Sequence, residues 1–266
     1  MRARASLAVV LGSGLSGVAA RTRELEGVPY ASIPDFGRTT VDGHPGRVSL
    51  GRVGSGLVVF FAGRFHVYEG LEPRAAAAPA LLAAALGCRR LVLTQAAGSL
   101  DRDLPPGSWM IPADIVSFPA RQGLLRGRAP SPRDVEGGFV EERPSSLAPL
   151  ISERLRVDLR EAALEAGVTA AEGALFWTPG PTYETSAEAG AASLMGARAA
   201  SMSSLPELAA ARALGMESAV ASWITNYAAP LASRSIDHEE VCRMGASGSE
   251  SLERILLRLV EKLGPE

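Results

Sequence analysis

The feature that most constrains this chain is a regular alternation of short apolar runs with alanine-rich stretches of helical length. The runs are rich in Val, Leu or Phe and are bounded by polar or turn-forming residues, a pattern typical of buried strands. The expected strands are 7–11, 57–62, 91–94, 174–178, 199–202 and 219–225. The expected helices are about 74–86, 151–166, 186–195, 205–214 and 248–263. This alternation predicts an α/β fold with a mainly parallel sheet.

Charge and composition exclude several classes of protein. Lys and Arg total 27 against 29 Asp and Glu, a formal net charge of −2, so we expect no nucleic-acid partner held by counterion release. The two cysteines, Cys88 and Cys242, are too few for a disulfide framework and lack the CxxC spacing of zinc sites. No stretch reaches the roughly 18 apolar residues of a bilayer span. We therefore expect no membrane association and a cytoplasmic location.

Two segments fit the alternation less well. The basic N-terminus and the apolar run after it resemble a signal peptide, but Gly12, Ser13 and Gly14 interrupt the run, which favours a buried strand. Residues 121–144 are rich in Gly, Pro, Arg and Glu without periodicity, so we expect a long surface loop or a subunit contact there. Because we find no repeat or linker, we expect one domain over 1–266.

Polar motifs follow the expected strands, where α/β proteins place their ligands. Gly12-Ser-Gly-Leu-Ser-Gly17 matches the dinucleotide pattern G-x-G-x-x-G but lacks the acidic residue expected at the end of the next strand. Its glycines would instead let backbone N–H groups converge on a phosphate, with the Ser13 hydroxyl as a further donor. A purely structural turn is the alternative.

The segment Gly63-Arg-Phe-His-Val-Tyr-Glu-Gly70 is the densest polar cluster. If it is extended, Arg64, His66 and Tyr68 project to one side, because successive side chains of a strand alternate. A guanidinium binds a dianion with two parallel hydrogen bonds, and an imidazole and a phenol can reach phosphate or sugar hydroxyls. A solvated hairpin is the alternative interpretation.

Further segments offer groups suited to an anion or a flat ring. The small residues of Gln95-Ala-Ala-Gly98 allow close approach to the backbone, or tight packing alone. Tyr183 supplies a ring, and Glu184 supplies a carboxylate or merely favours a helix N-terminus. Met202-Ser-Ser204 provides hydroxyls that hold an anion or cap the next helix. Asn226 presents both a donor and an acceptor, which suits the edge of a heterocycle.

The three histidines do not form a metal-binding motif. No pair has a ligand spacing such as H-E-x-x-H, so we expect no metal site. His44 lies in a turn and His238 precedes the last predicted helix. For either residue alone, a surface or capping role is the alternative to a role in a site.

Taken in order along nearly the whole chain, these segments resemble the trimeric purine nucleoside phosphorylases. The matching segments are Gly12-Ser-Gly-Leu, Gly43-His-Pro-Gly46, Gly63-Arg-Phe-His-Val-Tyr-Glu-Gly70, Ala96-Ala-Gly98, Gly180-Pro-Thr-Tyr-Glu-Thr185, Met202-Ser-Ser-Leu-Pro-Glu207, Ile224-Thr-Asn226 and His238-Glu-Glu-Val241. The third of these is the most specific signature. The resemblance implies one domain with a mixed, mainly parallel sheet flanked by helices, and a homotrimer.

The resemblance also implies an enzyme of purine salvage, a pentosyltransferase that needs no cofactor. Inorganic phosphate, the co-substrate, would attack the anomeric carbon of a ribonucleoside or deoxyribonucleoside, and the purine would leave. Implied phosphate ligands are Ser13, His44, Arg64, His66, the Ala96 backbone and Ser203; ribose contacts are Tyr68, Met202 and His238; base contacts are Tyr183, Glu184, Asn226, Ala97 and Gly98. The implied catalytic residues are His66, Glu184 and Asn226.

The expected preference is for 6-oxopurines such as inosine and guanosine. Glu184 can accept the N1–H of such a base, which adenine lacks, and an unpaired carboxylate in a closed site costs several kcal/mol. Asn226 can stabilise the leaving purine at N7, while the phosphate stabilises positive charge on the sugar. A phosphorylase of another nucleoside such as methylthioadenosine, and a non-catalytic nucleoside-binding relative, are the alternatives.

The sequence departs from the family pattern at three places. Gln95 replaces the usual Asn, and Ser201 replaces the usual Gly. Where the family presents a Phe-Pro lid from a neighbouring subunit, this chain has Arg143-Pro144, and the nearest aromatic residue is Phe139. Gln95 and Ser201 lie close to where the base and the phosphate are expected to bind. The third departure concerns the lid over the sugar.

Overall fold

The computed structural model describes residues 5–41, 43–117, 149–232 and 238–264. The strands within these ranges join in one sheet, in the order β2-β3-β4-β1-β5-β10-β9-β7, with β11, β6 and β8 attached through β5. They are β1 Leu7–Leu11, β2 Arg23–Pro29, β3 Arg47–Val53, β4 Gly56–Ala62, β5 Arg90–Ser99, β6 Trp109–Met110, β7 Asp114–Val116, β8 Ala170–Ala171, β9 Ala174–Trp177, β10 Ala197–Ser201 and β11 Glu217–Tyr227.

The centre of the sheet is parallel and is buried on both faces. Strand β1 pairs in parallel with β4 and β5, and β5 pairs in parallel with β11. Leu7, Val9 and Leu11 pack in one hydrophobic cluster. Ala8 and Val10 pack in a second cluster. Because alternate side chains of a strand enter opposite faces, a strand covered on both sides is apolar at every position, as the sequence is here.

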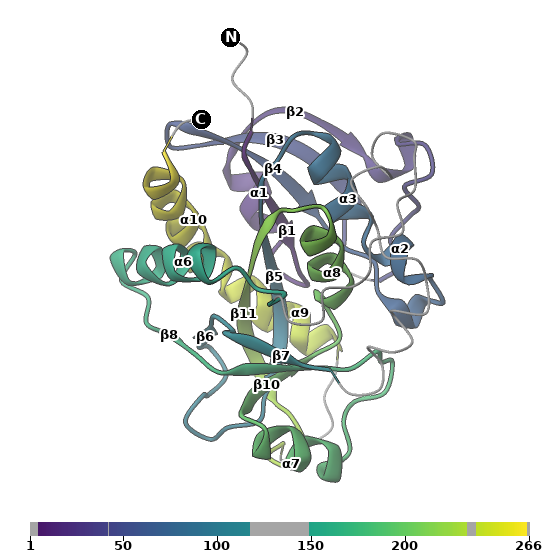
Figure 1. The fold of residues 1–266 in the computed structure, drawn as a ribbon, viewed down its shortest axis with the longest axis vertical. Coiled ribbons are helices and arrows are strands. Elements are labelled where there is room, and N and C mark those ends of the chain that lie inside the picture. The colour runs from purple at the N-terminus through teal and green to yellow at the C-terminus, as the bar shows by residue number, and fades with distance from the viewer. Residues whose placement is uncertain (1–4, 42, 118–148, 233–237, 265–266) are drawn as a thin grey trace.

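Helices cover both faces of the sheet (Figure 1). The described helices are α1 Gly17–Arg21, α2 Pro73–Ala76, α3 Ala78–Ala85, α6 Glu153–Glu165, α7 Ser186–Leu194, α8 Leu205–Ala213, α9 His238–Ser247 and α10 Ser249–Leu263, with short 3-10 turns η1 Tyr30–Ser32 and η2 Val67–Glu69. Helix α10 buries Leu252, Ile255, Leu256 and Leu259, the spacing of one helical face. Among these helices, none has the length and hydropathy needed to cross a membrane.

The sheet is mixed because antiparallel pairs flank its parallel centre. β3 is antiparallel to β2 and to β4. β10 is parallel to β9 but antiparallel to the end of β5, where Ala200 lies opposite Gly98. The carboxyl ends of β5 and β10 therefore run past each other. The structure has the predicted fold class, an α/β domain with a mixed, mainly parallel sheet.

Several expected boundaries were wrong. β5 and β11 extend through Ser99 and Tyr227, so Gln95–Gly98 and Asn226 lie within strands rather than after them. The expected helix 74–86 is divided into α2 and α3, with Pro79 in the first turn of α3, where a missing N–H is tolerated. The sequence pattern missed β2 because its residues are largely exposed and charged. The expected loop 121–144 lies outside the described residues.

Candidate functional site

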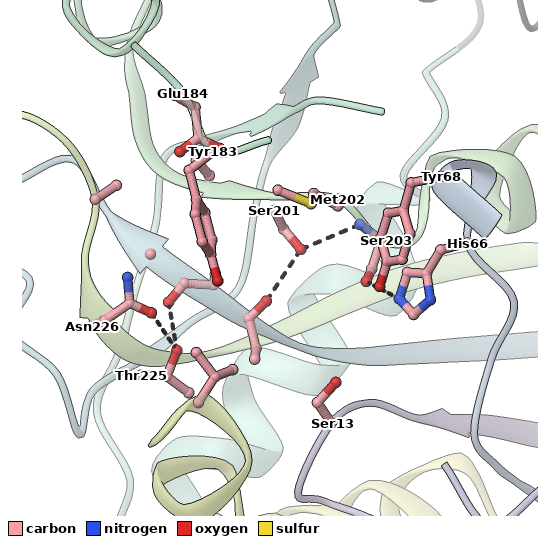
Figure 2. Close-up of a pocket in the computed structure, with 16 residues that line it drawn as sticks. Ser13, His66, Tyr68, Tyr183, Glu184, Ser201, Met202, Ser203, Thr225 and Asn226 are labelled. Atoms are coloured by element: carbon pink, nitrogen blue, oxygen red, sulfur yellow. Dashed lines mark hydrogen bonds between the residues drawn. The ribbon is translucent and has the colours of Figure 1, made fainter. Parts of the chain in front are cut away.

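A pocket opens where the ends of several strands meet (Figure 2). The space within it, including its open mouth, is about 590 Å³. Figure 2 shows His66 and Ser203 together at one end of this pocket, and Glu184 and Asn226 away from them. The predicted site residues that line it are Ser13, His66, Tyr68, Ala96, Ala97, Gly98, Tyr183, Glu184, Met202, Ser203 and Asn226. Residues from five strand ends and from the loop before α7 thus share one cavity.

The glycine-rich loop after β1 is shaped by close packing. A Cβ on Gly14, whose φ is +78°, would lie 2.4 Å from the carbonyl oxygen of Cys242 in α9. A Cβ on Gly12 would lie 2.7 Å from the carbonyl oxygen of Thr94 in β5. Close packing therefore accounts for Gly12 and Gly14, as expected if this loop is a structural turn. Between them, Ser13 is left at the pocket wall, with its Oγ 3.4 Å from His44 Nε2.

His66 is held by a carboxylate that the sequence analysis missed. The backbone N–H of His66 donates to Glu69 Oε1 at 2.6 Å, and the His66 Nδ1 lies 3.3 Å from the same oxygen. Because a carboxylate only accepts, the proton of the ring resides on Nδ1 and the lone pair on Nε2. That Nε2 lies 3.2 Å from Ser203 Oγ, so the Ser203 hydroxyl donates to it. The signal for Glu69 was its position three residues after His66 in the same motif.

Burial and charge set the protonation of this pair. Burial lowers the pKa of His66 and outweighs the hydrogen bond that its ring donates to Glu69, which raises this pKa. Burial alone would raise the pKa of Glu69, but hydrogen bonds with His66 and Thr40 bring it down to about 2. The site therefore holds a neutral imidazole beside an ionised carboxylate.

Aromatic rings pack beside this polar end. The rings of His66 and Tyr68 are stacked, with centroids 4.7 Å apart and planes 13° from parallel. The His44 ring lies 5.5 Å from that of His66. His44 is buried and contacts Ser13, but it does not line the pocket itself.

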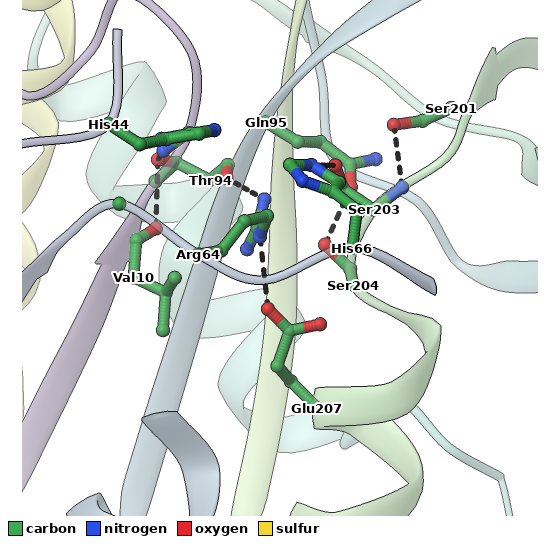
Figure 3. A network of polar contacts seen from close by, with 12 residues as sticks. Val10, His44, Arg64, His66, Thr94, Gln95, Ser201, Ser203, Ser204 and Glu207 are labelled. Carbon is green, nitrogen blue, oxygen red and sulfur yellow. Dashed lines mark hydrogen bonds and ion pairs between the residues drawn. The ribbon is translucent and has the colours of Figure 1, made fainter. Parts of the chain in front are cut away.

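Arg64 is not among the residues that line the pocket, although its charge lies close enough to both His66 and Tyr68 to influence their pKa values. The chain turns into η2 at Val67, and the alternation of an extended segment ends there. Arg64 is only 1% exposed, and Figure 3 shows its contacts with Thr94 and Glu207. Its Nε donates to Glu207 Oε1 at 2.9 Å, and its Nη1 donates to the Thr94 carbonyl oxygen at 2.7 Å.

The buried ion pair leaves one atom on each side chain without a partner. Within the described residues, Arg64 Nη2 and Glu207 Oε2 make no hydrogen bond. Buried polar atoms are nearly always paired, so an orphan of this kind needs an explanation. Glu207, in the first turn of α8, was also missed, because no local spacing links residues that are 143 positions apart.

Ser204 does not cap α8 in the expected way. Its backbone is left-handed, with φ +77° and ψ −29°, and its hydroxyl donates to Gln95 Oε1 at 2.6 Å (Figure 3). Gln95 is fully buried behind the pocket rather than in its wall. Ser201 lines the pocket; its hydroxyl donates to the Ala96 carbonyl oxygen at 3.1 Å and accepts from the Ser203 N–H at 3.3 Å.

Glu184 and Asn226 mark the other end of the pocket. Helix α7 is capped by Thr185 and Glu188, which form a reciprocal capping box, so Glu184 is not needed as a cap. Glu184 is 8% exposed, and burial raises its pKa. Asn226 accepts from Thr225 Oγ1 at 2.7 Å and donates to the Tyr227 carbonyl oxygen at 3.0 Å.

Some predicted features are not placed. His238 is the first residue of α9, but its side chain lies outside the described part of the structure. Arg143, Pro144 and Phe139 lie in the range that the structure does not describe. Among the described residues, no group of three or more His, Cys, Asp or Glu is arranged to hold a metal ion.

Comparisons with known proteins agree with this arrangement. A family model described as the phosphorylase superfamily matches residues 6–261. The purine nucleoside phosphorylase of Mycobacterium tuberculosis is 35% identical over 96% of this chain and 89% of its own length. Purine nucleoside phosphorylase 1 of Geobacillus stearothermophilus is 33% identical over 97% of this chain and 89% of its own.

Solved structures show the same fold. The structure of Schistosoma mansoni purine nucleoside phosphorylase in complex with inosine matches with a TM-score of 0.85 at 29% identity, over 98% of this chain and 92% of that one. A complex of a Schistosoma mansoni purine nucleoside phosphorylase with adenosine matches with a TM-score of 0.83 at 28% identity, over 100% of this chain and 94% of that one. The predicted fold class and family are confirmed: this chain belongs to the phosphorylase superfamily and, within it, to the purine nucleoside phosphorylases.

Proposed function

We propose that this enzyme cleaves purine ribonucleosides and deoxyribonucleosides with inorganic phosphate, preferring inosine and guanosine, and releases the free base and the sugar 1-phosphate. The observation that carries this proposal is that one pocket joins hydroxyl and imidazole groups at one end to an amide and a carboxylate at the other. Ser13, His66 and Ser203 form the first set, and Asn226 and Glu184 form the second. A small anion at the first end and a flat heterocycle at the second would thus bind next to each other in the same pocket.

Phosphate would bind at the end that carries Ser13, His66 and Ser203, with the Ala96 backbone, His44 and Arg64 as further ligands. The unpartnered Nη2 of Arg64 supports this assignment, because an anion would satisfy a buried cationic donor. The neutral His66 ring presents its lone pair on Nε2, which can accept a hydrogen bond from a monohydrogen phosphate dianion in place of the one from Ser203. Glu69 acts only through His66.

The sugar would lie between the two ends, against Tyr68, Met202 and His238. A phosphate oxygen forms a bond to the anomeric carbon while the bond from that carbon to purine N9 breaks, and its electron pair passes to the base. The proton of the phosphate dianion ends on the purine, so atoms and charge balance. The remaining phosphate charge stabilises the cationic character of the sugar during the transfer.

The base would bind through Glu184 and Asn226, with Tyr183, Ala97 and Gly98 packed against it. Ionised Glu184 accepts the N1–H of a 6-oxopurine, and Asn226 stabilises charge on the imidazole ring of the base. Adenine carries no proton at N1, so it would leave this carboxylate unpaired in a largely buried position. His66, Glu184 and Asn226 are the residues that we assign to catalysis.

We further propose that the active form is a homotrimer in which 1–266 forms one domain, and that the enzyme works in the cytoplasm. These statements rest on the sequence resemblance. Sedimentation of the purified protein tests the trimer, since a stable monomer with full activity would contradict it.

The function is tested by incubating the protein with inosine, guanosine, adenosine and methylthioadenosine, with and without phosphate, and measuring the free base by chromatography. We expect release of hypoxanthine and guanine that depends on phosphate and yields ribose 1-phosphate. Release that ignores phosphate, or tight binding of inosine without turnover, contradicts the proposal. Faster cleavage of methylthioadenosine than of inosine would assign a different nucleoside.

A further inference from the structure

We propose that Gln95 is a positioning residue for the phosphate end of the pocket, acting through the backbone of Ser204. This inference rests on the proposed function, because it concerns how the phosphate ligand Ser203 is placed. Gln95 departs from the family pattern and does not line the pocket, so the resemblance assigns no role to it.

The first observation is the unusual conformation of Ser204. Its φ of +77° lies in the left-handed region, which a residue with a Cβ adopts at a cost in free energy. A serine that begins a helix normally has an extended backbone and accepts a hydrogen bond from the first turn. Here the Ser204 hydroxyl donates to Gln95 instead. A fully buried residue thus keeps a strained backbone.

The second observation is the rigid support of Gln95 itself. Its Oε1 accepts from Ser204 Oγ at 2.6 Å, and its Nε2 donates to Ser222 Oγ at 3.0 Å. Ser222 is directly opposite Gln95 in the parallel pairing of β11 with β5. Gln95, Ser204 and Ser222 are all fully buried, so water does not compete for these bonds. The amide therefore ties the start of α8 to the centre of the sheet.

The third observation is the position of Ser203, the residue before Ser204. Its hydroxyl lies 3.2 Å from His66 Nε2, and its N–H donates to Ser201. The backbone angles of Ser204 set how helix α8 departs from Ser203, and therefore how far the Ser203 hydroxyl can move from His66. We conclude that the hydrogen bond that Ser204 donates to Gln95 fixes the Ser203 hydroxyl where phosphate would bind.

The sharpest test compares Ser204→Ala with Ser204→Gly. Both variants lose the same hydroxyl, but only glycine adopts a positive φ without strain. We expect KM for phosphate to rise about tenfold in Ser204→Ala, because this variant loses one buried hydrogen bond and also the left-handed backbone that the bond maintains. In Ser204→Gly, KM for phosphate should rise at most about twofold. KM for inosine should change little in either Ser204 variant. Equal KM values for phosphate in the two Ser204 variants would overturn the proposal.

A second test removes the amide. Gln95→Leu should raise KM for phosphate about tenfold in the wild-type background. It should raise KM by less than about threefold in the Ser204→Gly background, where the backbone no longer needs the bond. Ser218→Ala is the matched control, because Ser218 is a buried serine of β11 whose hydroxyl donates to the Leu150 carbonyl oxygen, outside the site. It should leave KM for phosphate unchanged.

Binding of inorganic phosphate alone, measured by calorimetry, separates this inference from the proposed function. If the wild-type protein does not cleave inosine with phosphate, the proposed function fails, whatever the variants do. If the wild type is active and Gln95→Leu binds phosphate as tightly as the wild type, only the positioning role fails. If Gln95→Leu does not fold, the two Ser204 variants decide the question.

Discussion

Glu207→Gln probes the buried ion pair behind the pocket. The side chains of Arg64 and Glu207 are each 1% exposed, and the Nε to Oε1 distance is 2.9 Å. Glutamine keeps an oxygen that can accept from Arg64 Nε but removes the negative charge. The guanidinium would then be buried with only the Thr94 carbonyl oxygen and a neutral amide as partners.

The magnitude follows from the burial of the pair. Removing one partner of a buried ion pair costs about 3–5 kcal/mol, because it leaves an uncompensated charge. Glutamine preserves the hydrogen bond, so we expect about 3 kcal/mol. With a urea m-value of about 2–3 kcal/mol per M, this lowers the unfolding midpoint by about 1–1.5 M. Protein concentration must be held fixed, since dissociation of an oligomer also shifts the midpoint.

The assay is urea unfolding, followed by fluorescence, with and without inorganic phosphate at constant ionic strength. If phosphate binds beside Arg64, the dianion supplies the charge that Glu207→Gln removes. Phosphate should therefore raise the midpoint of the variant more than that of the wild type. In the wild type, phosphate at about 100 times its Kd stabilises by about 2.7 kcal/mol.

The control is the double variant Arg64→Met with Glu207→Leu. Replacing both members of a buried pair by apolar residues of similar volume is often neutral or stabilising. This variant should unfold near the wild-type midpoint but should lose the stabilisation by phosphate. A midpoint of Glu207→Gln equal to that of the wild type, or no response of either protein to phosphate, would refute the reasoning.

Two further variants, which give three predictions, concern the pocket. Glu184→Gln should lower kcat/KM for inosine and guanosine about 10- to 100-fold in initial-rate assays, because a charge-assisted hydrogen bond is lost. Burial raises the pKa of Glu184, so its ionisation destabilises the protein as pH rises through that raised pKa. The Glu184→Gln variant should therefore have a higher melting temperature than the wild type at neutral pH and the same melting temperature in acid. A difference in melting temperature that does not depend on pH contradicts this. Ser201→Gly should raise KM for phosphate about fivefold, since Ser203 N–H and the Ala96 carbonyl lose their bridging hydroxyl; an unchanged KM contradicts it.

Local sequence patterns were sufficient for the central strands and most helices. The strand β1 has the predicted bounds, because a strand buried on both faces is apolar at every residue. The helix α7 was predicted because its sequence is rich in alanine over a helical length. The edge strand β2 was missed because it is exposed and partly charged, and the inner strand β3 was missed although most of its residues are buried.

Most residues of the pocket were also named from the sequence. The polar ones follow or end apolar strands, whereas the resemblance to the phosphorylases supplied the roles of Ala96, Ala97, Gly98 and Met202. Eleven of the predicted site residues line one pocket: Ser13, His66, Tyr68, Ala96, Ala97, Gly98, Tyr183, Glu184, Met202, Ser203 and Asn226. Their gathering follows from the parallel sheet, which brings strand ends to one edge.

Only the tertiary structure decided how these groups are supported. Arg64 turns inward to Glu207, 143 positions away, and Gln95 binds Ser204, 109 positions away. No local periodicity encodes such pairs, since they depend on where the whole chain places α8 against β5. The sequence by itself therefore determined which chemistry gathers at the sheet edge, and the packing of distant elements decided which side chains face the pocket and which hold the others in place.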